Sequence, residues 1–189
     1  MVWLLAENQA DLNAVDRWGR TALMWAIENE RSVAFLLLDI GADVKVGARD
    51  GSTALHLAAF KELEAAVASI LLKEGAIIDA RTQDRFTALH IAALRGAEEV
   101  VQVLLRHGAD VEAEARWPRV DNKDEKEDDL ADGSAMESLT ERLHQLLLQQ
   151  PPRAHIQAEV KHALTPQQLA ESSGHVDIQR LPGMQPTDS

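Results

Sequence analysis

The 189-residue sequence lacks cysteine altogether, and aromatic residues make up only 4% of it. Without cysteine the protein cannot form a disulfide scaffold, bind a metal through thiolates or use a cysteine nucleophile. Long apolar runs are also missing, since stretches such as Val33–Leu38 are far too short to span a membrane. The N-terminus has no basic segment followed by an apolar segment and a cleavage site, as a signal peptide would. These absences predict an intracellular protein, cytoplasmic or nuclear, without a membrane partner.

Positive charge is scarce as well, because 19 Lys and Arg residues stand against 31 Asp and Glu residues, for a net charge of −12. An acidic surface repels phosphate backbones, so we expect no nucleic-acid partner. The hydrophobic fraction of 46% is, however, too high for a wholly disordered chain. The composition therefore predicts one domain of ordinary size or an elongated array of small units.

Internal repetition decides between these two architectures. The triplet Thr-Ala-Leu occurs at residues 21–23, 53–55 and 87–89, at intervals of 32 and 34 residues. In each copy a Leu-Leu pair later precedes Gly-Ala, with the glycines at positions 41, 75 and 108. A threonine hydroxyl can cap the start of a helix, and a glycine can end one in the left-handed conformation. Each copy is therefore predicted to hold helices between these two signals.

The apolar residues of one copy predict two helices. The first is small-sided, with Leu89 followed by Ala92 and Ala93, so neighbouring helices can approach it closely. The second carries Val100, Val101, Leu104 and Leu105 on a single face. Neither helix can bury its apolar face alone, so the units are expected to stack.

The repeated unit resembles the ankyrin repeat, in which two helices and a projecting hairpin span about 33 residues. Residues 87–93 (TALHIAA) are similar to the family pattern T-P-L-H-x-A-A, and residues 104–111 (LLRHGADV) to L-L-x-x-G-A-D-V. The resemblance implies an all-α solenoid of about three full repeats, with a partial repeat before them and a divergent repeat after them. The expected boundaries are a partial repeat at 1–15, full repeats at 16–47, 48–81 and 82–117, an acidic insertion with an amphipathic helix at 118–160, a closing repeat at 161–182 and a disordered tail at 183–189.

Two departures from the pattern stand out. Arg85 occupies the hairpin position at which the first two repeats have Gly19 and Gly51. No threonine appears near position 120, where the register predicts one, and an insertion of about forty residues comes first. Its first part, residues 121–132, holds seven acids and two lysines, and is expected either to stay hydrated or to occupy the groove described below. Its second part has leucines at positions 139, 143, 146 and 147, which predict an amphipathic helix lying on the solenoid or offered to a partner.

Seven histidines raise the question of a metal site. His56 and His90 occupy the histidine position of the T-x-L-H motif, which in the ankyrin family implies hydrogen bonding between hairpins. The other histidines lack spacings such as H-E-x-x-H. A calcium loop beginning at Asp128 fails, because Leu130 and Leu139 stand where oxygen ligands are needed. Catalytic and nucleotide-binding motifs are absent from the sequence too, so we predict no metal, no cofactor and no enzymatic activity.

The resemblance implies that the protein binds a partner protein through the concave groove of hairpins and first helices. The expected contact residues are Arg17, Trp18, Arg20, Arg49, Asp50, Phe60, Lys61, Asp84, Phe86, Leu94 and Arg95. The tryptophan, the two phenylalanines and the leucine of this set should face solvent as interface anchors, the alternative being that each packs against the next hairpin. Trp25, beside Ala26, is instead expected in the core. Basic residues outnumber acidic ones in the set, so we expect a partner segment with acidic and apolar residues.

Two other functions remain as alternatives. One is a regulatory or targeting segment of a larger and even enzymatic parent protein, because Met1 lies within a repeat. The more remote one is a metal-responsive module that uses the acidic insertion. In addition, residues 2–5 belong to a second helix whose own first helix is missing, so we expect an apolar edge through which the chain aggregates or pairs.

Overall fold

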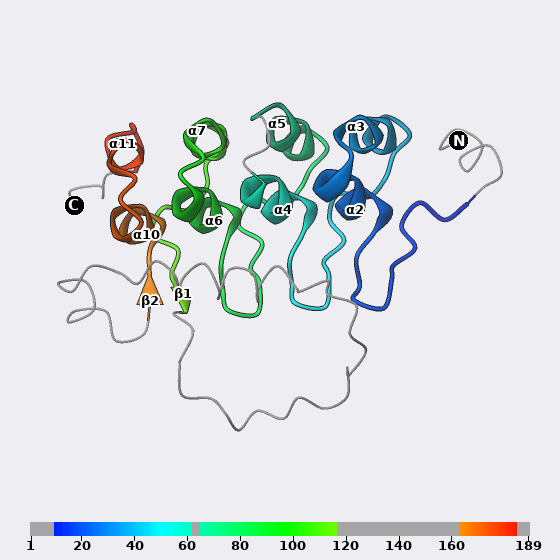
Figure 1. The fold of residues 1–189 in the computed structure, drawn as a ribbon, viewed down its shortest axis with the longest axis horizontal. Helices are drawn as coiled ribbons and strands as arrows, with labels where there is room; N and C mark the ends of the chain where they lie inside the picture. The colour runs from blue at the N-terminus through cyan, green and yellow to red at the C-terminus, as the bar shows by residue number, and fades with distance from the viewer. Residues whose placement is uncertain (1–9, 62–64, 117–162, 185–189) are drawn as a thin grey trace, which may run out of the picture.

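The computed structural model describes residues 10–61, 65–116 and 163–184, and within these ranges four helix pairs stand in a row (Figure 1). The first helices of the pairs are α2 (Ala22–Asn29), α4 (Ala54–Phe60), α6 (Ala88–Arg95) and α10 (Pro166–Ser172). The second helices are α3 (Arg31–Asp39), α5 (Ala65–Lys73), α7 (Glu98–Arg106) and α11 (Val176–Gln179). The first helices lie between the second helices and the projecting hairpins (Figure 1). The predicted all-α solenoid of helix-helix-hairpin units is thus confirmed.

Threonine begins each first helix, as the sequence predicts. The side-chain oxygens of Thr21, Thr87 and Thr165 accept hydrogen bonds from the backbone N–H three residues further on. In the second unit the backbone N–H of Thr53 donates to Nδ1 of His56 over 3.1 Å. These caps satisfy N–H groups that have no partner inside the helix, and so they fix the residue at which each helix starts.

Glycine ends the second helices in the left-handed conformation. Gly41 and Gly75 both have φ of +87°, and the following residue donates its N–H to a carbonyl of the last helical turn, as in Ala42 N to Leu37 O at 2.9 Å. This backbone conformation is strained for residues with a Cβ, which explains the recurrence of glycine at the end of each unit.

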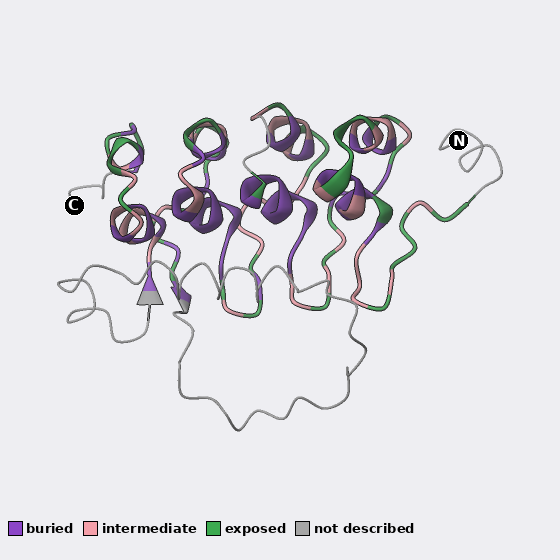
Figure 2. Cartoon of the chain, in the orientation of Figure 1, coloured by how far each residue is buried: buried purple, intermediate pink, exposed green. Residues whose placement is uncertain are grey.

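The core lies where consecutive helix pairs meet (Figure 2). Alanines at the centre of the first helices, such as Ala58, Ala59, Ala92 and Ala93, are completely buried, and larger side chains from the second helices close the core behind them. One continuous apolar cluster runs from Leu23 in α2 to the region of α11. The small side chains let the first helices approach closely, so that stability comes from contacts between neighbouring units.

The fourth hairpin holds the insertion. Gly108 and Thr165 are 57 positions apart, whereas Gly41 and Thr53 are 12 apart, so the insertion adds 45 residues. The chain leaves along β1 (Ala115–Arg116) and returns along β2 (Ala163–Leu164), and these strands pair antiparallel with Ala115 opposite Leu164. The stack therefore continues from α6 and α7 to α10 and α11 across the insertion. The partial repeat before Ala10, the acidic run, the amphipathic helix and residues 185–189 lie outside the described residues.

Candidate functional site

Hydrogen bonds connect the hairpins to one another along the row. Arg49 N donates to Trp18 O over 2.9 Å, and Gln83 N donates to Asp50 O over 2.9 Å. The side-chain amide of Gln83 also donates to the carbonyl of Arg49. The spacing is so close that a Cβ on Gly51 would lie 2.9 Å from Arg81 O. The hairpins thus form a rigid surface on which side chains are held in fixed positions.

Tryptophan and arginine side chains gather on the first hairpin and on α2. We refer to Asp16, Arg17, Trp18, Arg20 and Trp25 as the Trp–Arg cluster. The guanidinium carbon of Arg17 lies 4.0 Å from the centre of the Trp18 ring. That of Arg20 lies 4.8 Å from the Trp18 ring and 4.4 Å from a Trp25 ring. These distances are within the range of favourable cation–π contacts, so both indoles are held by the same arginine.

Asp16 holds the cluster together. Its Oδ1 accepts hydrogen bonds from the backbone N–H groups of Trp18 and Arg20, each over 2.9 Å. Its Oδ2 accepts from Nε and Nη2 of Arg20, at 3.1 and 3.0 Å, and from Nε1 of Trp25 at 3.1 Å. Burial by itself raises the pKa of this carboxyl, but the hydrogen bonds outweigh burial, and the pKa lies below its ordinary value. Asp16 is therefore ionised near neutral pH. It holds the Trp25 ring directly and the Trp18 ring through Arg20.

Arg20 positions the indoles more than it offers charge to solvent. In addition to Asp16 it faces Glu28, with Nη1 3.6 Å from Oε2, and the two side chains are only 12% and 8% exposed. Trp18 and Trp25 are half-buried, and Arg17 is exposed beside them. The cluster thus presents two preorganised aromatic side chains next to an exposed cation.

The hairpins also form a basic edge, which we define as Arg17, Arg49, Arg81 and Arg85, all exposed. The acidic residues of the same hairpins are half-buried and take part in the turns: Asp16 binds Arg20, and Asp50 accepts from the backbone N–H of Ser52 over 2.9 Å. The edge is therefore basic although the whole chain carries a net charge of −12.

Three of the expected contact residues are buried, so the prediction that they face solvent is wrong. Phe60, Phe86 and Leu94 are only 7%, 1% and 5% exposed. The Arg95 guanidinium covers Phe60 at 5.0 Å, and the Phe86 ring lies edge-on to His90 with 5.9 Å between ring centres. Leu94 belongs to the continuous apolar cluster. All three side chains are therefore buried, and the contacts observed for them are with Arg95, with His90 and with the apolar cluster. Packing against the next hairpin stays a prediction.

The other expected contact residues remain accessible to different degrees. Arg17, Arg49 and Lys61 are exposed, while Trp18, Arg20, Asp50, Asp84 and Arg95 are half-buried. The expected contact residues of the first two hairpins lie in or beside the Trp–Arg cluster and the basic edge. Lys61 and Arg95 lie at the ends of α4 and α6.

Trp25 is not in the core, contrary to expectation, and Asp16 was missed. Leu57 and Ile91 hold the position of Trp25 in the next two units, counted from the capping threonine, and both are buried. Within the described residues no first helix precedes α2, so its side chain at this position stays half-exposed and reaches Asp16. An aspartate can accept a hydrogen bond from the backbone N–H two residues further on and so favours a turn. Asp16, two residues before Trp18 in the first hairpin, could have been predicted from this signal.

The two buried histidines connect units, as the resemblance implies. Nε2 of His56 donates to Phe86 O and Nε2 of His90 donates to Leu164 O, each over 3.0 Å. A carbonyl can only accept, so Nδ1 is left to accept from the capping threonine of the same unit. Burial lowers the pKa of both rings, that of His90 to about 4. Both rings are therefore neutral and structural at physiological pH.

The described residues contain no group of three or more His, Asp or Glu side chains that could hold a metal ion. None of their helices is long and apolar enough to cross a membrane.

Part of the chain matches a known protein family. Residues 33–115 match the model for ankyrin repeats, in three copies. The matched range begins in α3 and ends in β1, while α2, α10 and α11 lie outside it and have the same arrangement of paired helices (Figure 1).

Proposed function

The chain is an ankyrin repeat protein, and on this basis we propose that it recognises a partner protein through its hairpins and first helices. Ankyrin repeats generally serve as protein–protein interaction modules, and domains built from them are typically non-catalytic. The observation that carries the proposal is the Trp–Arg cluster, in which Asp16 accepts five hydrogen bonds from Trp18, Arg20 and Trp25. Such an arrangement suits recognition, because little conformational freedom is lost when a partner binds.

The chemistry of this face favours one kind of partner. Half-buried tryptophans supply apolar surface for an aliphatic or aromatic side chain, and the basic edge beside them attracts carboxylates. A protein segment with acidic and apolar residues fits both features. Its charge would also complement the basic edge rather than the acidic remainder of the chain.

The test begins with a pull-down and mass spectrometry to identify a partner. Titration calorimetry then compares the full chain with the Trp18→Ala variant. A central aromatic anchor contributes about 2 kcal/mol, so we expect the dissociation constant to rise about thirtyfold. The matched control is Gln102→Ala on α7, on the opposite face of the stack, which should leave the affinity unchanged. Unchanged affinity after Trp18→Ala would contradict the proposal.

A further inference from the structure

The second helices, on the side opposite the hairpins, differ in their outer surfaces. On α7, Gln102 donates to Glu98 over 3.2 Å and accepts from Arg106 over 3.4 Å, which gives a polar surface. Counted back from the glycine that ends each unit, Phe35 of α3 holds the position of Gln102. Its ring is half-buried and contacts Arg31, whose guanidinium carbon lies 5.8 Å from the ring centre. The unit of α3 thus has an aromatic ring at the position where the unit of α7 has a hydrogen-bonded amide.

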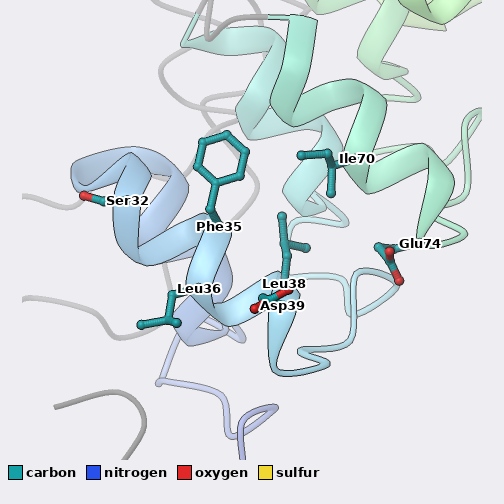
Figure 3. Close-up of a pocket in the computed structure, with 7 residues that line it drawn as sticks. All are labelled: Ser32, Phe35, Leu36, Leu38, Asp39, Ile70 and Glu74. Carbon is teal, nitrogen blue, oxygen red and sulfur yellow. The ribbon is translucent and has the colours of Figure 1, made fainter.

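A depression of about 460 Å³ opens beside this ring, between α3 and α5 (Figure 3). It is lined by Ser32, Phe35, Leu36, Leu38, Asp39, Ile70 and Glu74. Phe35 and Ile70 face one another across the depression, and the carboxylates of Asp39 and Glu74 lie at its other end (Figure 3). The lining residues carry two negative charges and no positive charge. The site therefore combines an apolar wall with an acidic end.

We propose that this depression is a second docking site, which takes an amphipathic helix from a partner protein. Two neighbouring helices with an apolar gap between them form the walls that helix-in-groove recognition uses, with apolar anchors three or four residues apart on the ligand. Asp39 and Glu74, both exposed, select a lysine or arginine on that helix by charge complementarity. The occupant is thus a basic amphipathic helix.

This site extends the proposed function from recognition to scaffolding. The basic edge and the acidic end of the depression carry opposite charges, and they lie on opposite sides of the stack (Figure 1). A segment that suits one is repelled by the other, so the two partners do not compete. The full chain can hold both at once.

The experiment pans a random peptide library, displayed on phage, on the immobilised full chain. Enriched peptides are synthesised, and their affinities are measured by fluorescence anisotropy on wild-type protein and on Phe35→Gln and Asp39→Arg. These two changes give α3 the residues of α7 at the same positions, Gln102 and Arg106, and thermal unfolding checks that the fold is kept. The control is Trp18→Ala, which alters the hairpin side only.

We expect one class of peptides to have apolar residues three or four apart together with lysine or arginine. Either α3 variant should weaken this class about tenfold or more, and Trp18→Ala should leave it unchanged. The proposal is overturned if every enriched peptide binds both α3 variants as well as wild type, or if the peptides sensitive to Phe35→Gln are acidic. The proposed function is tested separately by the acidic peptides. If they bind Trp18→Ala as tightly as wild type, binding at the hairpins is contradicted, whatever the α3 variants show.

Discussion

Acid should destabilise the stack through its buried histidines, and His90 allows the size of the effect to be worked out. Burial disfavours the imidazolium form, so the folded chain protonates His90 only near pH 4, whereas the ordinary pKa is 6.5. Between these two pH values the unfolded chain binds more protons, so stability falls as the pH falls. The contribution of His90 is fully present above its ordinary pKa and is lost as the pH approaches 4.

The magnitude follows from the two pKa values of His90. Each unit between them corresponds to about 1.4 kcal/mol, so the full difference is about 3 kcal/mol. On lowering the pH from about 7 to about 5, protonation of the unfolded state alone removes about 2 kcal/mol. His56, whose pKa burial also lowers, acts in the same direction.

The assay is urea unfolding followed by circular dichroism, near pH 7 and near pH 5, for wild type and for His90→Gln. Gln168 holds the same position in α10, where its Oε1 accepts from Thr165 N over 3.0 Å, so glutamine can serve as a cap there. The variant cannot titrate, and the loss of stability between the two pH values should be about 2 kcal/mol smaller than in wild type. The carboxylates titrate in both chains, so their contribution cancels when the two losses of stability are subtracted. Equal losses in the two chains would refute the reasoning.

Two further substitutions test local features. Arg85 has φ of +64°, a conformation that costs a residue with a Cβ about 1–2 kcal/mol. Glycine avoids this cost but has more conformational freedom to lose on folding. Arg85→Gly should therefore raise the free energy of unfolding by about 1 kcal/mol. Arg85→Ala, which removes the charge and keeps the strain, should give no such gain in urea unfolding. In Asp16→Asn an amide NH2, which can only donate, replaces the oxygen that accepts from three side-chain N–H groups. The free energy of unfolding should therefore fall by about 1 kcal/mol. The indole N–H resonance of Trp25 should then move toward that of a solvent-exposed indole, and an unchanged resonance would show that Asp16 does not hold the ring.

The fold could be predicted from the sequence because its signals are local. Threonine at 21, 53 and 87 and glycine at 41, 75 and 108 determine where helices start and end through their own backbone and side-chain hydrogen bonds. These interactions span only a few residues, and they recur in each unit. The stacking of units then follows from the apolar faces that remain.

The site could be predicted only in part, because exposure is set by neighbours distant in sequence. Phe86 is an aromatic residue of the kind that anchors interfaces, yet its side chain is buried and packs edge-on against the ring of His90. Trp25 has the position of a core residue, yet it lies at the first helix of the described stack. The depression beside Phe35 depends on the approach of α5 to α3, which no local pattern indicates.

The position of the insertion has a consequence for the order of folding. The hydrogen bond from His56 to Phe86 joins residues 30 apart, whereas the equivalent bond from His90 to Leu164 joins residues 74 apart. Closure entropy grows only with the logarithm of chain length, so the longer closure costs about 0.8 kcal/mol more, a penalty that the contacts of α10 with α6 can offset. Contacts between near neighbours form before distant ones. We therefore expect the first three units to form first and to provide the template onto which the fourth docks.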